Sequence, residues 1–183
     1  MSVFDMRGEE MQLFGAVAAG LIPATSLVCH PGTHNKWVSV VDGKVCAFRT
    51  VMTGEMFNLL RERSVLAEFL TGEVSLNDAF LAGVRRGLGG PPLTAEIFSV
   101  RARILLGDLP RESAMSFTSG LLVGVDLSVG LALAGGAEIV MMGSPGLTGL
   151  YAAAAKEAGH WATEIDGAQA FVAGALAVAR TMQ

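Results

Sequence analysis

The segment from Pro31 to Trp37, with the sequence PGTHNKW, carries residue types that bind phosphate. Gly32 has no side chain to keep an anion away from the backbone, and the amides and hydroxyl around Thr33 can donate to phosphate oxygens. Lys36 adds a positive charge, whereas His34 by itself indicates no function. The segment therefore predicts a phosphate-binding turn. The alternative is a plain turn whose geometry is set by its proline and glycine, with the polar side chains in solvent.

The stretch from Met6 to Glu10, MRGEE, places an arginine and two carboxylates at the entrance of the first predicted helix. Glu9 or Glu10 could act as a general base toward a sugar hydroxyl or coordinate Mg²⁺, and Arg7 could hold a substrate carboxylate with two hydrogen bonds. Acidic residues are also typical of a helix N-terminus, where the helix dipole favours negative charge. Both interpretations stay open, and we assign no residue as a metal ligand.

A third segment, GSPGLTG from Gly143 to Gly149, is expected to be a turn between a strand and a helix. Backbone amides at such a position point toward a phosphate or a nucleotide. Asp166 at the end of the next predicted strand raises the alternative of a dinucleotide-binding unit. The GxxGxxG spacing and the single helix after Asp166 disfavour it. A glycine turn needed only for packing the helix on the sheet is a further alternative.

The spacing of apolar residues predicts the elements that position these segments. A short helix from Glu9 is expected to end at Pro23, followed by a buried strand over residues 26–29. Two further strands, KWVSVV and KVCAFRTV, are joined by Asp42 and Gly43, a strong signal for a β-hairpin. Three consecutive antiparallel strands are therefore predicted.

The rest of the chain predicts helices and then alternating elements. Residues from about 54 to 107 have helical spacing, with breaks at Gly72, at GLGGPP and at Gly107. After Pro110 comes a long helix that is apolar all round and is expected between layers. Strand, helix, strand and helix complete the order βββ, helical insert, αβαβα. This order predicts an α/β fold with a mixed sheet that has helices on its faces.

The composition indicates one globular, soluble domain. The chain has 183 residues, of which 51% are hydrophobic and 16% charged, enough for one ordinary core. Its net charge of −4 gives no general attraction to nucleic acid. Asp126 and Glu138 interrupt the most apolar region, so no membrane span is predicted, and no secretory signal is expected at the start. With only two cysteines, the chain is expected in the cytoplasm.

Together these segments resemble the carboxy-terminal lobe of the superfamily of sugar kinases, hexokinases, heat-shock proteins and actin, whose lobes have a ribonuclease H-like core. PGTHNKW occupies the place of the second phosphate motif, GSPGLTGLYAAAAKEAG resembles the adenosine motif, and DGAQAFVAGALAVA resembles the second connecting helix. More narrowly, MRGEEMQLFGA, HPGTHNKWV, FRTVMTGEMFNLL and SGLLVG resemble the 2-dehydro-3-deoxygalactonokinase family. This second resemblance covers nearly the whole chain.

The resemblance implies a kinase that uses ATP and Mg²⁺ to phosphorylate the 6-hydroxyl of 2-dehydro-3-deoxy-D-galactonate in galactonate breakdown. The residues implied at the β- and γ-phosphates are Gly32, Thr33 and His34, with Lys36 nearby. Those implied beside the adenosine are Gly143, Ser144 and Gly146. Glu9 or Glu10 takes the place of the catalytic base. Phosphoryl transfer needs mainly positioning and charge stabilisation, which fits a signature of glycine turns.

Members of this superfamily also have a first lobe with an aspartate-glycine-threonine phosphate loop, and no such segment precedes Met1. We therefore expect residues 1–183 to be a carboxy-terminal lobe with a helical insertion at about 54–107, and to have negligible kinase turnover alone. The expected partners are ATP, the sugar acid, and either an amino-terminal lobe or a second copy of the chain. The alternative function is a non-catalytic ribonuclease H-like interaction module that buries its apolar helices in a dimer or partner interface.

Overall fold

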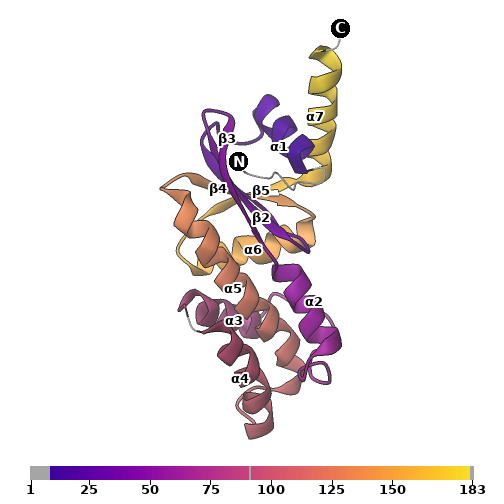
Figure 1. Cartoon of the computed structure of the whole chain (residues 1–183), viewed down its shortest axis with the longest axis vertical. Coiled ribbons are helices and arrows are strands. Elements are labelled where there is room, and N and C mark those ends of the chain that lie inside the picture. The colour runs from indigo at the N-terminus through magenta and orange to yellow at the C-terminus, as the bar shows by residue number, and fades with distance from the viewer. Residues whose placement is uncertain (1–8, 91, 182–183) are drawn as a thin grey trace.

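The computed structural model describes residues 9–90 and 92–181 (Figure 1). In chain order its elements are α1 (Glu9–Ala18), β1 (Ser26–His30), β2 (Asn35–Val41), β3 (Lys44–Val51), α2 (Thr53–Arg63), α3 (Asp78–Leu88), α4 (Leu93–Leu106), a short 3₁₀ turn η1 (Arg111–Ser113), α5 (Ala114–Ala134), β4 (Glu138–Gly143), α6 (Pro145–Glu157), β5 (Ala162–Asp166) and α7 (Gly167–Thr181). The predicted order of strands, helical insert and alternating elements is confirmed.

The five strands form one mixed sheet in the order β3-β2-β1-β4-β5. β1, β2 and β3 pair antiparallel, whereas β4 runs parallel to β1 and β5 runs parallel to β4. The turn between β2 and β3 has positive φ at both Asp42 (51°) and Gly43 (73°), the backbone geometry that a two-residue hairpin requires. The predicted hairpin and mixed sheet are therefore confirmed.

Alternate side chains of the central strands pack against two different layers of helices. On one face, Val28 and Val140 pack in a cluster with residues of α1 and α7. On the other face, Leu27 and Met141 pack with residues of α3, α5 and α6. Figure 1 shows α1 and α7 on one side of the sheet and α5 and α6 on the other. Every residue of β1 is buried, as expected for a central strand that is covered on both faces.

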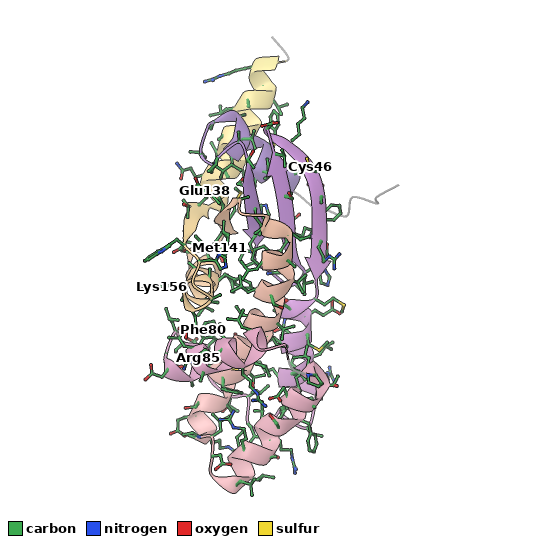
Figure 2. All side chains as sticks on the ribbon, turned by 90° about the vertical axis from the view of Figure 1, so that its left-hand side faces the viewer. Cys46, Phe80, Arg85, Glu138, Met141 and Lys156 are labelled. Atoms are coloured by element: carbon green, nitrogen blue, oxygen red, sulfur yellow. The ribbon has the colours of Figure 1, made fainter. Side chains whose placement is uncertain are left out.

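The helices α2, α3 and α4 and the first half of α5 form the end of the elongated molecule away from α7 (Figure 1). On α3, Phe80 is buried in the core, whereas Arg85 lies at the surface and pairs with Glu157 of α6 at 2.8 Å (Figure 2). This end has its own apolar cluster, which includes Leu66, Phe69 and Leu70.

One helix of this insert is shorter than its sequence spacing predicts. Helical spacing predicts a helix up to Gly72, but α2 ends at Arg63, so this prediction is wrong. The hydroxyl of Ser64 donates to the carbonyl of Leu60 and accepts the N–H of Leu66, and Ser64 itself has an extended backbone. A serine that bonds the backbone in this way competes with the helix ladder. Leu66, Phe69 and Leu70, which follow, are buried although they do not belong to a helix.

The long apolar helix α5 lies between the sheet and the helical insert, as predicted. The segment Arg111–Ala134 is long and apolar enough to span a membrane, but 61% of its most apolar stretch is buried inside the protein. It also carries Asp126, whose side chain is buried. Burial of this kind is typical of the core helix of a globular protein.

The segment GSPGLTG is not a turn over its whole length. β4 ends at Gly143 and α6 begins at Pro145, so Gly146 to Gly149 already belong to the helix and only Ser144 lies between the strand and the helix. Proline in the first turn favours helix initiation because its φ is fixed and its missing N–H needs no partner there.

Several glycines allow helix backbones to touch, which explains part of the high glycine content of the chain. A Cβ built on Gly83 of α3 would lie 2.1 Å from the carbonyl oxygen of Phe117, and one on Gly120 of α5 would lie 2.0 Å from that of Phe80. In α1, a Cβ on Gly15 would lie 2.1 Å from the carbonyl oxygen of Ala170 in α7. These distances are below any real contact, so a side chain at these positions forces the helices apart.

We predict that Gly83→Ala and Gly120→Ala each lower the free energy of unfolding by about 1–3 kcal/mol, because the α3–α5 pair must separate. Gly146→Ala is the matched control, since a Cβ there meets nothing within 4 Å and alanine is the better helix former. Urea unfolding followed by circular dichroism measures all three. Unchanged stability of Gly83→Ala would contradict the packing described.

Candidate functional site

Three segments that are distant in sequence meet at one end of the sheet. They are the start of α1, the loop at residues 31–34 between β1 and β2, and the end of β4, and they line a cavity of about 320 Å³. This volume lies within the range of small-molecule sites. The lining residues are Glu9, Gln12, His30, Pro31, Gly32, Thr33, His34, Lys36, Met142 and Gly143. The structure therefore brings the predicted phosphate turn together with one carboxylate of MRGEE and the first glycine of GSPGLTG.

The two neighbouring glutamates of α1 have different surroundings. Glu9 accepts a hydrogen bond from Lys36 Nζ at 3.1 Å, and the side chain of Lys36 is only 7% exposed, so water screens this ion pair less than a surface pair. Glu10 instead lines a second cavity of similar size, between α1 and the β2–β3 hairpin, whose other walls are apolar residues and a glycine. Glu9 alone is thus placed with the predicted phosphate turn.

The backbone of the loop is open at Gly32. No atom of the described residues lies within 4 Å of a Cβ built there, and Gly32 is not among the glycines with positive φ. The turn therefore does not need glycine for its conformation, which weakens the alternative that Gly32 only shapes the turn. The Gly32 N–H donates to Asn35 Oδ1 at 2.7 Å, and Thr33 and His34 next to it are exposed. The space that a side chain on residue 32 would occupy is therefore open.

The first turn of α2 holds the other side of the loop. The N–H of Glu55 donates to the carbonyl oxygen of Thr33 at 2.9 Å, and the Glu55 carboxylate pairs with the Nε2 atom of His34. A Cβ on Gly54 would lie 2.4 Å from the carbonyl oxygen of Gly32, so α2 and the loop are in direct backbone contact. Gly54 and Glu55 lie within FRTVMTGEMFNLL, but no local pattern marks them as site residues, because only the tertiary fold brings α2 to the loop.

His30, the last residue of β1, also lines the cavity, and the sequence alone did not indicate it as a site residue. Both of its ring nitrogens are buried, and neither has a hydrogen-bond partner among the residues that the structure describes. Burial lowers the pKa of His30 from 6.5 to about 4; Glu9 raises it and Lys36 lowers it by smaller amounts. The imidazole is therefore neutral near pH 7. The sequence contains one signal for His30 as a site residue: it directly follows the strand predicted over residues 26–29 and directly precedes PGTHNKW.

Behind the loop, the buried carboxylate of Asp126 accepts four hydrogen bonds. Its Oδ2 accepts from Asn35 Nδ2 at 2.7 Å and from the hydroxyls of Thr53 and Tyr151 at 2.6 Å each, and its Oδ1 accepts from Trp37 Nε1 at 2.8 Å. Burial raises the pKa of Asp126, and the hydrogen bonds oppose this rise. The network joins α5 to β2, α2 and α6. The sequence shows Asp126 only as an interruption of an apolar stretch.

The remaining candidate residues are placed as follows. Gly143 lies beside Pro31, since a Cβ on Gly143 would be 3.7 Å from the Pro31 ring. Ser144 and Gly146 are exposed at the start of α6 and do not line the cavity. Arg7 lies outside the described residues. Within the described ranges, no group of three His, Cys, Asp or Glu residues could hold a metal ion.

Asp166, which suggested the dinucleotide alternative, bonds to the backbone of the helix that follows it. Asp166 Oδ1 accepts the N–H groups of Ala168 and Gln169, at 2.7 and 3.1 Å, in the first turn of α7. A side chain that caps its own helix in this way satisfies backbone donors of the helix N-terminus. This contact explains Asp166 without a ribose.

The fold places the chain in a known structural class. The activator of 2-hydroxyisocaproyl-CoA dehydratase from Clostridium difficile, solved with bound ADPNP, matches 96% of this chain and 68% of its own chain with a TM-score of 0.57. The two sequences are 15% identical, so this likeness concerns the fold alone. The class is that of actin-like ATPase-type folds, built on a mixed five-stranded sheet with helices on its faces.

Within this structural class, proteins of similar sequence identify the family. The family model for 2-keto-3-deoxy-galactonokinase matches residues 3–178, and the chain belongs to this family. It is 40% identical over 178 residues to 2-dehydro-3-deoxygalactonokinase of Escherichia coli K12, covering 97% of this chain and 60% of the relative. A Rhizobium meliloti protein, DgoK1, which carries the same enzyme name as a provisional assignment, is 38% identical over 186 residues.

A crystal structure from Sinorhizobium meliloti, also provisionally named 2-dehydro-3-deoxygalactonokinase, matches with a TM-score of 0.89 and 37% identity. The match covers 97% of this chain and 60% of that chain. This chain thus spans about 60% of the length of the curated relatives that it matches. The family expected from the sequence motifs is confirmed.

We predict that His30 makes the stability of the protein sensitive to acid. Because its folded pKa of about 4 lies below the ordinary 6.5, the unfolded chain binds the proton more readily. The stability that neutral His30 contributes is present above pH 6.5 and is lost as the pH falls toward 4, by about 3 kcal/mol in total. Unfolding free energies measured from pH 7.5 to pH 4 test this.

His30→Leu should remove this part of the pH dependence, because leucine does not titrate. It should also leave stability at pH 7.5 unchanged or higher, since it removes two unsatisfied buried nitrogens. The control is His160→Leu at an exposed position, which should keep the pH dependence of the unaltered chain. An identical pH profile for His30→Leu and the unaltered chain would be inconsistent with this assignment.

Proposed function

We propose that this chain is the nucleotide-binding lobe of a kinase that transfers the γ-phosphoryl group of ATP to the 6-hydroxyl of 2-dehydro-3-deoxy-D-galactonate. The observation that carries the proposal is the open backbone at Gly32 beside the Glu9–Lys36 pair, in a chain of this family. An anion-accepting turn next to a carboxylate is the combination that phosphoryl transfer to a hydroxyl needs.

The loop supplies the phosphate contacts. The hydroxyl of exposed Thr33 and the backbone amides around Thr33 donate to the β- and γ-phosphates, and the ammonium of Lys36 offsets their charge. The N–H of Gly32 is bonded to Asn35, so Gly32 contributes open space and not a donor. His34, which is paired with Glu55, closes the outer side of the loop. Gly143 was expected beside the adenosine, but it lines the same cavity as the loop, so we assign it to the phosphates instead. Ser144 and Gly146, exposed at the start of α6, remain assigned to the adenosine.

Apolar surface also lies beside Gly32. Gly32 also lines a separate apolar cavity, whose walls include Phe57 of α2 and Leu147 and Leu150 of α6. Gly32 thus lines both the polar cavity and this smaller apolar one of about 130 Å³, and we assign the two to the two ends of ATP. The phosphates and the acceptor hydroxyl belong on the polar side, and the nucleoside belongs on the apolar side.

Glu9 is the better candidate of the two glutamates for the catalytic base. Glu9 lines the same cavity as the loop at residues 31–34, whereas Glu10 lines the second cavity between α1 and the β2–β3 hairpin. In the reaction, the 6-hydroxyl oxygen forms a bond to the γ-phosphorus, the bond from that phosphorus to the bridging oxygen breaks, and ADP leaves. The hydroxyl proton passes to Glu9, and Arg7 holds the carboxylate of the sugar acid.

Mg²⁺ fits this site as a companion of ATP. The described residues hold no cluster of three ligands for an ion, and Glu9 is assigned to proton transfer, so we assign no residue of the chain as a ligand: Mg²⁺ would be held mainly by the phosphates and water. When bound, the ion neutralises charge that develops on the phosphates.

We also infer the architecture, the partner and the cellular location of the chain. The sheet order β3-β2-β1-β4-β5 supports a ribonuclease H-like lobe with a helical insertion over about 54–107. The relatives are longer than this chain, and we infer that the rest of such a protein, a first lobe, closes the cavity, with a second copy of the chain as the alternative partner. Free Cys29 and Cys46 support a reducing, cytoplasmic location.

Calorimetric titration of the chain with ATP and Mg²⁺ tests this function. We predict saturable binding that becomes about tenfold weaker in Thr33→Val, because a hydrogen bond to a charged phosphate is lost. Thr163→Val on β5 is the matched control, with an exposed threonine that lines no part of the cavity, and it should bind as the unaltered chain does.

Two results would overturn the proposal. Saturable binding of NAD without binding of ATP would favour the dinucleotide alternative at the β4–α6 junction. A tight dimer that binds no nucleotide would favour the interaction module, which could use exposed Phe14 of α1 and Phe171 and Leu176 of α7.

A further inference from the structure

The loop that carries Gly32 and Thr33 is held from two sides, and both supports lead back to Asp126. The first support is the side chain of Asn35. Its Nδ2 donates to Asp126 Oδ2 at 2.7 Å, and its Oδ1 accepts the Gly32 N–H at 2.7 Å. An ionised carboxylate only accepts hydrogen bonds, so it fixes which end of the amide faces it. The carbonyl end of Asn35 must then face the loop, where it can accept from Gly32.

The second support is the start of α2. The hydroxyl of Thr53 donates to Asp126 Oδ2 at 2.6 Å, which fixes the first residue of the helix. The next two residues are those that touch the loop: Gly54 lies against the Gly32 carbonyl, and the Glu55 N–H donates to the Thr33 carbonyl at 2.9 Å. The position of α2 relative to the loop is thus tied to the same carboxylate.

The other two donors to Asp126 do not lead to the loop by a hydrogen bond. The hydroxyl of Tyr151 comes from the middle of α6, and the indole N–H of Trp37 comes from the interior of β2. The carboxylate therefore has two contacts that continue to the loop and two that end in the core. Removing one of the first two contacts should affect the loop, whereas removing one of the other two should affect only the stability of the core.

We propose that Asp126 is a positioning residue that sets the conformation of the Gly32–Thr33 loop through Asn35 and Thr53, and so prepares it for phosphate. The inference rests on the proposed function for the ligand, but the positioning itself is a property of the free protein. With both supports in place, the loop is ordered before the ligand arrives, which reduces the entropy lost on binding.

The test compares hydroxyl deletions that remove equivalent hydrogen bonds. Thr53→Val and Tyr151→Phe each remove one hydroxyl that donates to Asp126 Oδ2 at 2.6 Å, but only Thr53 leads to the loop. Asn35→Ala removes the first support. Amide hydrogen exchange by NMR reports the opening of the loop through the Gly32 N–H, and the Val28 amide in the central strand β1 reports global opening.

In the free chain we expect the Gly32 amide to exchange at least about tenfold faster, relative to Val28, in Asn35→Ala and in Thr53→Val, and within about twofold of the unaltered chain in Tyr151→Phe. Calorimetry with ATP and Mg²⁺ should show about tenfold weaker binding for Asn35→Ala, whose side chain lines neither cavity. Thr53 and Tyr151 both line the apolar cavity, so amide exchange in the free chain, and not ATP binding, is the measurement that compares these two variants.

Equal acceleration in Thr53→Val and Tyr151→Phe would overturn the inference, because Asp126 would then be only a general anchor of the core. Unchanged exchange in both Thr53→Val and Asn35→Ala would overturn it as well. The expected exchange pattern without any ATP binding by the unaltered chain would support the positioning role and refute the proposed kinase function, so the two failures are distinguishable.

Discussion

The arrangement of this protein depends on one buried charge, the carboxylate of Asp126 in the middle of an otherwise apolar helix. A buried carboxylate without partners costs several kcal/mol, and hydrogen bonds from all sides are needed to offset that cost. Here the partners come from β2, α2 and α6, so these elements must meet α5 in one particular arrangement for the charge to be satisfied. Apolar contacts alone would tolerate small shifts of these elements, whereas the four hydrogen bonds do not.

Around this fixed point, glycine determines how closely the helices approach. Gly83 and Gly120 bring α3 and α5 into backbone contact, and Gly15 does the same for α1 and α7. Gly130 of α5 lies under the ring of Trp37, at a distance where a Cβ would be 2.3 Å from ring atoms. Close packing of this kind allows a chain with few aromatic residues to fill two layers on either side of a sheet.

Much of the fold could be predicted from the sequence because its signals are local. The Asp42–Gly43 turn, the buried strand β1 and the apolar helix α5 each depend on neighbouring residues. The segment after Arg63 could not be predicted, because the hydroxyl of Ser64 ends the helix although the apolar spacing continues.

The candidate site was predictable only as separate pieces. PGTHNKW and MRGEE were identifiable from residue types, but adjacent Glu9 and Glu10 have the same chemistry and differ only in the direction that α1 gives them. His30, Gly54 and Glu55 became recognisable once the sheet and α2 were in place. Tertiary contacts, which a local pattern does not contain, decide these positions.

The parallel pairing of β1 with β4 has a consequence for how the cavity comes into existence. The loop after β1 faces the end of β4 only when strands from opposite halves of the chain have paired, and Asn35 reaches Asp126 across 91 residues of sequence. Contacts of such high contact order form late, because the entropy of closing a long loop is lost before they stabilise anything. On a ribosome, the hairpin of β2 and β3 can therefore form early, while the binding cavity must wait until α5 and β4 have been synthesised.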